Sequence, residues 1–582
     1  MRHITTIPSV KLYKIFFSFL LLLFLLCARL VQLQIHQAKK LYDRGQKNFL
    51  RVKKIPSTRG NILDANNKLI ATNIPTHNIY WQGLGARKLS NKDMQILESI
   101  EKIINKNIVK NNTLLAKIKS AEKYKKKTVI ASDITFGQLS KIEEMFCDTN
   151  SIIVETSFKR LYPYQAFASH LLGYLGRMEL GHMGHTGKMG LEKIFEDTLK
   201  GKSGSIITTI NSFGTKLSEQ TIENALSGGD IQINLDIDLQ QVVETIFPKE
   251  SNGTCILMDP YDGAILALVS KPSFDPNIFL SPISQEEWNN LKDNHPFLNR
   301  AFSASYPPGS IFKLVTISAA LETDIITPNS TCECKGYIHF ARRKYWCNKH
   351  DGHGLLNTSE ALEQSCNILF YEIAKKINID TLADYAHRFG FGEKTNIIFP
   401  EKTGIVPTKQ WKMETKGERW WKGETLSASI GQSFLTITPI QAARMISSIF
   451  TGYLVTPRIL KDETIIKQKL DISQDTLNFL RQSMKKVITQ GTGKNISKIK
   501  DFEVYGKTST AQTSDLRKRK MGKKYREHRW FVAYLRYKNQ KPITFVIVIE
   551  HAEHPSEAKQ ALRKFLIEYR RVVDRRRNIR DT

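Results

Sequence analysis

Ser310 and Lys313 are the two residues of this 582-residue chain whose types and spacing most directly suggest chemistry. A hydroxyl and an amine three residues apart lie on the same face of a helix. A serine hydroxyl is a weak nucleophile at neutral pH unless a base takes its proton, and a desolvated lysine can be that base. Pro307, Pro308 and Gly309 favour a turn that opens into a helix at Ser310. The sequence therefore predicts an activated serine at a helix N-terminus, where the helix dipole stabilises a developing oxyanion.

A second serine and an asparagine supply groups for proton transfer. Ser365-Cys366-Asn367 lies 55 residues after Ser310. We expect the Ser365 hydroxyl to relay a proton between Lys313 and a leaving amine, because general acid–base catalysis needs such a group within hydrogen-bond reach. We expect the Asn367 amide to donate to a substrate amide and to Lys313.

A polar run near the C-terminus adds a second cation and the remaining substrate contacts. Lys507-Thr508-Ser509-Thr510 lies on a predicted strand, 197 residues after Ser310. Lys507 would keep Lys313 less protonated and attract a substrate carboxylate. Thr508 would add a hydroxyl for that carboxylate, and Ser509 belongs to the same substrate-binding strand. The N–H of Thr510 would face that of Ser310 as the second oxyanion donor.

Strands at both ends of the C-terminal part must position these groups. Apolar patterns predict strands at residues 231–235, 254–258, 264–270, 530–537 and 543–550, with helix-rich sequence between them. This order predicts an α+β domain over residues 229–573, with a five-stranded antiparallel sheet flanked by helices. A last helix, 556–573, would end in a basic tail over 574–582 that contains Arg575, Arg576, Arg577 and Arg580.

The N-terminus predicts a membrane anchor. Residues 15–28 are uncharged and the apolar character continues to about residue 35, which favours a transmembrane helix over 15–35. Arg2, Lys11 and Lys14 precede it and favour a cytoplasmic tail over 1–14. A cleaved signal peptide is the alternative, but no small-x-small site follows the apolar core. We therefore expect residues 36–228 and everything after them to be exported.

The net charge of +30, from 86 basic and 56 acidic residues, suggests an anionic partner. No zinc finger, recognition helix or RNA-binding signature accompanies this charge, so the sequence argues against nucleic acid. A basic exterior also suits an anionic membrane or cell-wall surface.

The three motifs together resemble those of penicillin-binding proteins and class A β-lactamases. Further matches resemble the transpeptidase domain of high-molecular-weight penicillin-binding proteins, namely Asn299-Arg300-Ala301, Gly431-Gln432, Thr438-Pro439-Ile440-Gln441 and Gly491-Thr492-Gly493. The anchor and Arg59-Gly60-Asn61-Ile62-Leu63-Asp64 resemble the class B members, which implies a mixed pedestal domain over residues 36–228. Gly352-His353-Gly354 and Trp420-Trp421 are most similar to the elongation-type group, penicillin-binding protein 2. The family pattern is Lys-Thr-Gly, and here Ser509 stands in place of the glycine, which predicts retained but changed acylation.

The resemblance implies a serine-type D-Ala-D-Ala transpeptidase in the bacterial inner membrane, acting in cell elongation. Its substrates would be peptidoglycan stem peptides on lipid-linked glycan strands, its inhibitors β-lactams, and its partners a SEDS-type membrane glycan polymerase and other elongation-complex proteins. Two alternatives are a division-specific class B transpeptidase and a weakly catalytic scaffold or β-lactam sensor with the same fold.

Four cysteines crowd into 35 residues, which in an exported domain indicates a metal or disulfides. Cys332, Cys347, His353 and Cys366 offer three thiolates and an imidazole, a tetrahedral set that zinc favours. We therefore predict a structural zinc ion, and some elongation-type relatives are similar in holding zinc at matching positions. The alternative is a disulfide, Cys332–Cys347 or Cys334–Cys347, with Cys334 otherwise a spare thiol or an alternative ligand.

Overall fold

The structure is a computed structural model that describes residues 9–55, 57–177, 185–210, 216–281, 283–293, 295–512, 522 and 525–581. The chain divides into two compact units, one of residues 1–59 with 200–229 and the other of residues 60–199 with 230–582. Residues 60–199 thus belong to the same compact unit as the C-terminal part of the chain.

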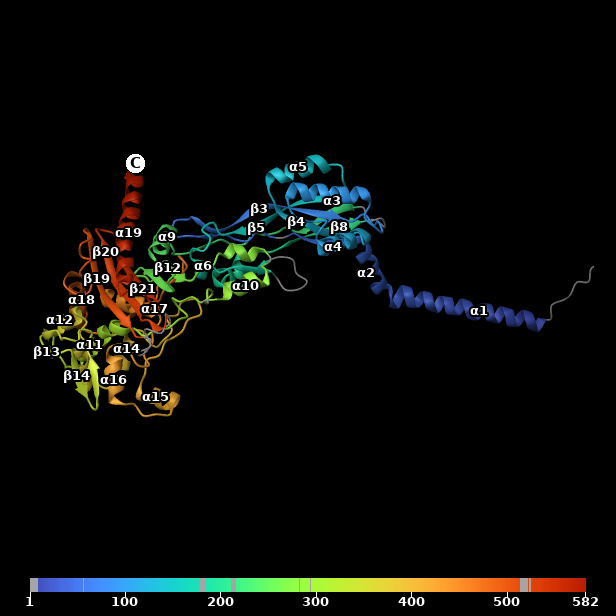
Figure 1. Cartoon of the computed structure of the whole chain (residues 1–582). Coiled ribbons are helices and arrows are strands. Elements are labelled where there is room, and N and C mark those ends of the chain that lie inside the picture. The colour runs from blue at the N-terminus through green and yellow to red at the C-terminus, as the bar shows by residue number, and fades with distance from the viewer. Residues whose placement is uncertain are drawn as a thin grey trace, which may run out of the picture. The chain divides into compact units, whose positions relative to one another are not determined.

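The first unit begins with a long apolar helix. α1 (Ser9–Val31) continues through the π-helical turn η1 (Gln32–His36) to α2 (Ala38–Phe49). The segment Leu12–His36 is long and apolar enough to cross a membrane, by length and composition. The same unit holds an antiparallel sheet of order β1-β8-β9, formed by β1 (Leu50–Ile55), β8 (Gly204–Ile210) and β9 (Lys216–Glu223) (Figure 1).

The second unit contains a mixed lobe built on a five-stranded sheet. Its long strand β3 (Leu69–Gln82) pairs with β2 (Ile62–Leu63), β4 (Lys127–Ile134) and β5 (Ile152–Leu161), and β10 (Ile231–Gln232) pairs with β2 in parallel. The lobe's helices are α3 (Asn91–Ile104), α4 (Asn112–Lys123) and α5 (Phe136–Phe146), and they bury apolar side chains against β3 and β4. Short elements follow: α6 (Ser169–Leu172), β6 (Leu175–Arg177), β7 (His185–Gly187), α7 (Gly190–Ile194) and α8 (Glu196–Leu199).

Polar contacts explain why this lobe belongs with the C-terminal part. Asp64 accepts a hydrogen bond from the N–H of Ile237 (3.1 Å), at the start of α9 (Ile237–Ile246). Lys68 forms an ion pair with Asp238 of the same helix (2.6 Å). The ring of His170 bonds to the carbonyl oxygen of Pro296 (2.7 Å). The β2–β3 turn and α6 are therefore fixed to the domain that contains the catalytic motifs.

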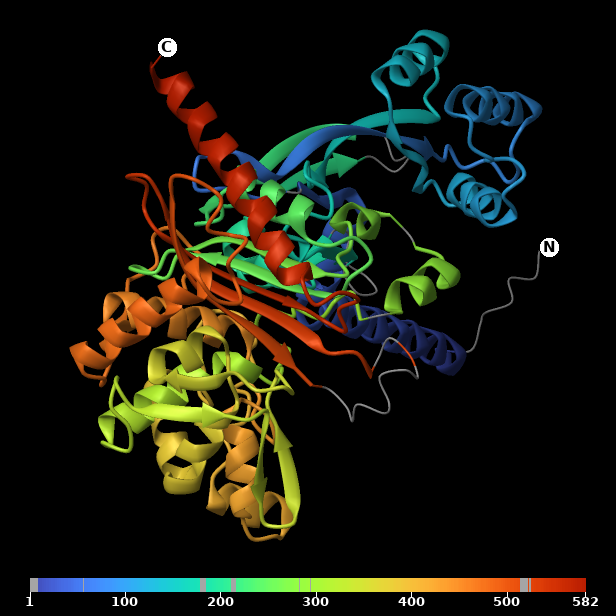
Figure 2. The same ribbon diagram turned by 60° about the vertical axis from the view of Figure 1, so that its left-hand side comes forward.

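A second five-stranded sheet, antiparallel throughout, confirms the predicted α+β architecture. Its order is β12-β11-β21-β20-β19, from β11 (Gly253–Met258), β12 (Ile265–Lys271), β19 (Phe502–Ala511), β20 (His528–Tyr537) and β21 (Ile543–Ile549). Successive side chains point to opposite faces. Phe545 and Ile547 pack in the core with α9 and α19 (Glu557–Asp581), which runs across the sheet in Figure 2, whereas Val546 and Val548 pack in the core with α17 (Pro439–Thr451).

The predicted basic tail is wrong in one respect, because α19 continues through it to Asp581. Arg576 forms ion pairs with Asp236 (2.6 Å) and Asp238 (2.5 Å), and Asp236 caps the N-terminus of α9. Carboxylates at a helix N-terminus are already stabilised by the helix dipole, and here they also anchor a distant arginine. These ion pairs stabilise the helical conformation of residues 574–581.

The remaining elements surround the motif residues. They are η2 (Pro276–Leu280), α10 (Gln285–Lys292), η3 (Gly309–Ile311), α11 (Lys313–Glu322), β13 (Thr331–Cys334), β14 (Tyr337–Phe340), β15 (Arg343–Trp346), β16 (Gly354–Asn357), α12 (Thr358–Glu363), α13 (Ile368–Lys376), α14 (Ile379–Arg388), α15 (Lys409–Lys416), α16 (Lys422–Ser429), β17 (Tyr453–Val455), β18 (Lys467–Lys469) and α18 (Gln474–Thr489). Residues 313–320 of α11 are all buried, so α11 is a central helix of the domain.

Candidate active site

The predicted nucleophile lies on a tight turn at the start of the central helix. Ser310 is the middle residue of η3, and Lys313 begins α11. Gly309 has φ 54°, a left-handed conformation that glycine adopts without steric cost, and its N–H donates to the carbonyl oxygen of Gly431 (2.9 Å). A short 3₁₀ turn thus replaces the predicted first α-helical turn. The hydroxyl of Ser310 remains partly exposed while Lys313 is fully buried.

Ser365 links the nucleophile to both lysines. Its hydroxyl lies 2.9 Å from the Ser310 Oγ and accepts a hydrogen bond from the Lys507 Nζ (2.9 Å). The Lys313 Nζ is 3.3 Å from the same hydroxyl. Among the described residues, no hydrogen bond joins Lys313 directly to Ser310. Hydrogen bonds therefore connect Ser310 to the two lysines through Ser365, whereas the sequence predicted Lys313 itself as the base for Ser310.

The Lys313 amine is surrounded by oxygen atoms. It donates to the carbonyl oxygen of Ser365 (2.7 Å) and to the Asn367 Oδ1 (2.8 Å), with the carbonyl oxygen of Cys366 at 3.3 Å. Asn367 therefore accepts from Lys313, opposite to the predicted direction, and its Nδ2 donates to the carbonyl oxygen of Trp346 (3.1 Å). These contacts fix the side chain of the motif asparagine at both ends.

Burial sets the protonation of the two lysines. It lowers the pKa of Lys313 to about 8, although the thiols of Cys366 and Cys347 oppose the shift. It lowers the pKa of Lys507 well below the usual value, and the charge of Lys313 lowers it further. Two ammonium groups are unfavourable in so small and dry a space. Burial and the repulsion between the two charges therefore favour the neutral form of one of the two amines.

The strand that carries Lys507 lies at the free edge of the catalytic sheet. β19 pairs only with β20 in the described part of the chain, so its other edge faces the nucleophile turn. Thr508 places its hydroxyl 2.8 Å from that of Thr492, which belongs to the Gly-Thr-Gly segment. The hydroxyl of Thr510 accepts a hydrogen bond from Arg529. We did not predict this contact of Thr492 with Thr508, although Thr492 lies in the Gly491-Thr492-Gly493 segment that resembles the family.

The oxyanion assignment of Thr510 agrees with the direction of its peptide groups. A Cβ atom added to Gly309 would lie 2.7 Å from the carbonyl oxygen of Thr510, so this carbonyl faces the turn and not β20. In an extended strand, the N–H and C=O of one residue point to the same side. The N–H of Thr510 therefore points toward the same side as the turn that carries the N–H of Ser310.

Comparisons with known proteins agree with this geometry. The sequence matches the penicillin binding protein transpeptidase domain over residues 253–567, more than half of the chain. The chain belongs to the penicillin-binding protein transpeptidase family. Residues 54–233 match the penicillin-binding protein dimerisation domain.

Several relatives of this penicillin-binding protein are known. The peptidoglycan D,D-transpeptidase MrdA of Acinetobacter baumannii is 30% identical, over 97% of this chain and 88% of that protein. PBP2 in its complex with MreC, from Helicobacter pylori, is 28% identical with a TM-score of 0.76, covering 90% of this chain and 99% of that one. A chain of a peptidoglycan synthase complex is 27% identical with a TM-score of 0.74, covering 97% and 98%.

The cysteine cluster of this penicillin-binding protein differs from the predicted set in one ligand. Cys334, Cys347, His353 and Cys366 bring one donor atom each to within 4.8 Å of one another. The predicted Cys332 is absent from this group, because β13 and β16 pair Cys334 with Gly354, next to His353, and pair Cys332 with Leu356. The register between β13 and β16 therefore places Cys334 and not Cys332 in the cluster, and sequence alone does not reveal this register.

The donor atoms fit a tetrahedral metal ion. The Sγ atoms of Cys347 and Cys366 are 3.7 Å apart, and the His353 Nδ1 lies 3.4 and 3.5 Å from the sulfurs of Cys334 and Cys347. Zinc–sulfur bonds of about 2.3 Å and zinc–nitrogen bonds of about 2.0 Å in a tetrahedron would place such atoms roughly 3.5–3.8 Å apart. The thiols of all seven cysteines are free in the structure, which therefore contains neither of the two disulfides that were the alternative to zinc.

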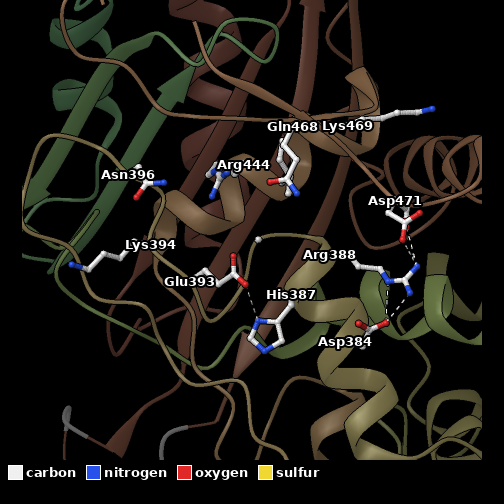
Figure 3. A pocket seen from close by; sticks show the side chains of 12 residues that line it. Asp384, His387, Arg388, Glu393, Lys394, Asn396, Arg444, Gln468, Lys469 and Asp471 are labelled. Carbon is white, nitrogen blue, oxygen red and sulfur yellow. Dashed lines mark hydrogen bonds and ion pairs between the residues drawn. The ribbon is translucent and has the colours of Figure 1, made fainter. Parts of the chain in front are cut away.

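A cavity of about 420 Å³ lies apart from these residues (Figure 3). It is lined by α14, the loop after it, Arg444 of α17 and the β17–β18 hairpin. Arg388 forms ion pairs with Asp384 (2.9 Å) and Asp471 (2.8 Å) there. None of the motif residues lines this cavity, so we do not assign it a catalytic role.

Proposed function

We propose that this penicillin-binding protein is a peptidoglycan D,D-transpeptidase of cell elongation, which cross-links stem peptides through an acyl-enzyme on Ser310. The observation that carries this proposal is the series of contacts from the Ser310 Oγ to the Ser365 Oγ (2.9 Å) and on to the Lys507 Nζ (2.9 Å). A hydroxyl joined to a buried amine through a second hydroxyl is an activated nucleophile. The MrdA relatives and the similarity to PBP2 structures support the assignment.

Acylation begins when the Ser310 Oγ attacks the carbonyl carbon between the two terminal D-alanines of a stem peptide. The Ser310 proton passes to the Ser365 oxygen as Ser365 gives its own proton to the neutral amine of the lysine pair. The N–H groups of Ser310 and Thr510 stabilise the oxyanion. The C–N bond then breaks, Ser365 gives a proton to the leaving amine while the lysine ammonium returns one to Ser365, and D-alanine departs.

The free carboxylate of the terminal D-alanine needs polar partners beside β19. The hydroxyls of Thr508 and Thr492 are 2.8 Å apart and offer two donors. Lys507 is fully buried and directed at Ser365, so it does not contact this carboxylate. In the second half of the reaction, an amine of a neighbouring stem peptide attacks the Ser310 ester, the ester C–O bond breaks, and the amine proton passes through Ser365 to the Ser310 oxygen. The new amide bond is the cross-link.

A structural zinc ion held by Cys334, Cys347, His353 and Cys366 is part of the proposal. Zinc would supply a tetrahedral link between the β13–β16 segment and the motif segment of Ser365 and Asn367. Cys366 lies between these two residues, and the Cys347 sulfur accepts the N–H of Asn367 (3.3 Å). The cluster residues thereby position the motif asparagine.

The location and partners follow from the anchor and the relatives. A helix whose first turns carry Lys11 and Lys14 ahead of its apolar run suits a single-pass inner-membrane protein with a cytoplasmic N-terminus. Donor strands would come from a SEDS-type glycan polymerase in the same membrane, which the likeness to a peptidoglycan synthase complex supports. An elongation-complex protein like MreC would bind as in the H. pylori complex. β-Lactams would acylate Ser310.

Analysis of reaction products tests this function. The full-length protein is incubated with glycan strands that carry uncut pentapeptides, and the digested muropeptides are separated by chromatography. The proposal predicts cross-linked dimers that disappear when penicillin is added. Tetrapeptide monomers without any dimers would indicate a carboxypeptidase, and unchanged pentapeptides would indicate a non-catalytic scaffold.

A further inference from the structure

Ser509 lies beneath the turn that carries the nucleophile. Its side chain is 5% exposed, on the same buried face of β19 as Lys507. Its hydroxyl donates to the carbonyl oxygen of Pro308 (2.7 Å), two residues before Ser310. This side chain points into the protein and already donates a hydrogen bond, so it does not narrow the space for a substrate.

The turn is held on its other side by different contacts. The N–H of Gly309 donates to the carbonyl oxygen of Gly431 (2.9 Å), and Tyr306 exchanges two backbone hydrogen bonds with Ile437 (2.8 and 2.9 Å). A Cβ atom on Gly309 would lie 2.5 Å from the Ser509 Oγ, so the turn packs directly on this hydroxyl. Among the described residues, the Ser509–Pro308 hydrogen bond is the only one that joins residues 306–310 to β19.

This bond ties together the two elements that supply the oxyanion donors. The N–H of Ser310 belongs to the turn, and the N–H of Thr510 follows Ser509 directly on β19. Oxyanion donors act only when both are held at hydrogen-bond distance from the developing charge. A glycine at position 509 would leave the turn and the strand in contact but without this hydrogen bond.

We infer that Ser509 is a positioning residue that fixes the separation of the two oxyanion donors and so sets the rate of acylation at Ser310. This inference rests on the proposed function, because it concerns the same nucleophile. The effect is expected in the chemical step and not in the first reversible binding of a substrate or β-lactam, since the hydroxyl is not available to a ligand.

Stopped-flow acylation of the detergent-solubilised full-length protein by nitrocefin tests the inference. The dependence of the rate on nitrocefin concentration separates the acylation rate constant from the dissociation constant of the reversible complex. We compare the unsubstituted protein with Ser509→Ala and Ser509→Gly, two changes that remove atoms and add none. Ser448→Ala is the matched control, because Ser448 is also a buried serine whose hydroxyl donates to a backbone carbonyl, that of Met445 (2.8 Å), within α17.

We expect both Ser509 variants to lower the acylation rate constant about tenfold, with a dissociation constant within threefold of the original value, because losing one oxyanion donor entirely costs about 100- to 1000-fold. Ser448→Ala should leave both constants within twofold. A fall of less than threefold in the acylation rate constant, or a fall confined to binding, overturns the role of Ser509. Failure of the unsubstituted protein to be acylated would overturn the proposed function itself, and the two failures are thus distinguishable.

Discussion

We expect Glu550 to contribute strongly to the free energy of unfolding of the protein, through contacts close to Ser310. One carboxylate oxygen accepts hydrogen bonds from the Arg300 Nε (3.0 Å) and from the Tyr306 hydroxyl (2.7 Å). The Arg300 side chain is 3% exposed and that of Glu550 is 15% exposed. Removing one partner of a buried ion pair costs about 3–5 kcal/mol, because the other charge stays buried without compensation.

The two substitutions at this position should differ. Glu550→Gln keeps an acceptor for Tyr306 and loses only the charge, so we expect a loss near the lower end, about 3 kcal/mol. Glu550→Ala also removes the acceptor of Tyr306, which adds about 1 kcal/mol. Glu553→Gln is the matched control, because its ion pair with Arg526 has the same 3.0 Å distance but side chains that are 58% and 40% exposed. An exposed pair contributes about 0.2–1 kcal/mol.

Urea unfolding of the detergent-solubilised protein, followed by tryptophan fluorescence, measures these differences. The expected order of stability loss is Glu550→Ala, then Glu550→Gln, then Glu553→Gln, with at least about 2 kcal/mol between the last two. If Glu550→Gln costs no more than Glu553→Gln, burial does not strengthen this pair and the reasoning is wrong.

Three other changes have outcomes that the structure specifies. Ser365→Ala should lower the second-order rate constant of penicillin acylation by about 10²–10⁴-fold, because the proton relay is lost; a fall of less than tenfold would contradict the relay. Cys334→Ser should lower the zinc content of protein purified without chelator, measured by mass spectrometry of the metal, whereas Cys332→Ser should not; equal zinc in both variants would count against the assigned ligands. Burial lowers the pKa of His170 to about 4, so the unfolded chain, whose histidine pKa is about 6.5, binds more protons as the pH falls from about 6.5 to 4, and stability is lost over that window. Between pH 7.5 and pH 5, the free energy of unfolding of the His170→Asn variant, measured in urea, should therefore fall by about 2 kcal/mol less than that of the unsubstituted protein. Equal falls in the two proteins would show that His170 is not buried in its neutral form.

Much of the fold and the site could be predicted from sequence because both depend on short-range patterns. The apolar run in residues 543–550 predicts a strand, and the structure places Phe545 and Val546 in two different cores. Ser310 and Lys313 are one turn apart whatever packs around them. The strands at the two ends of the domain pair with each other in one sheet, and the helix-rich sequence lies between them along the chain.

The details that sequence did not predict depend on register and on distant partners. Cys332 and Cys334 both lie on β13, and only the pairing of β13 with β16 brings Cys334 beside His353. The basic C-terminal residues look like a solvated tail until Arg576 meets Asp236 and Asp238 at the start of α9. The direction of the Ser509 hydroxyl likewise depends on how closely the turn at Pro308 approaches β19.

The most direct test of the central claim is the intact mass of the full-length protein after reaction with a fluorescent penicillin, beside a Ser310→Ala variant. The account predicts one stable adduct per chain, located on the peptide that contains Ser310 and absent from the variant. An adduct that persists in Ser310→Ala, or no adduct on the folded, zinc-replete protein, would contradict an acyl-enzyme on Ser310.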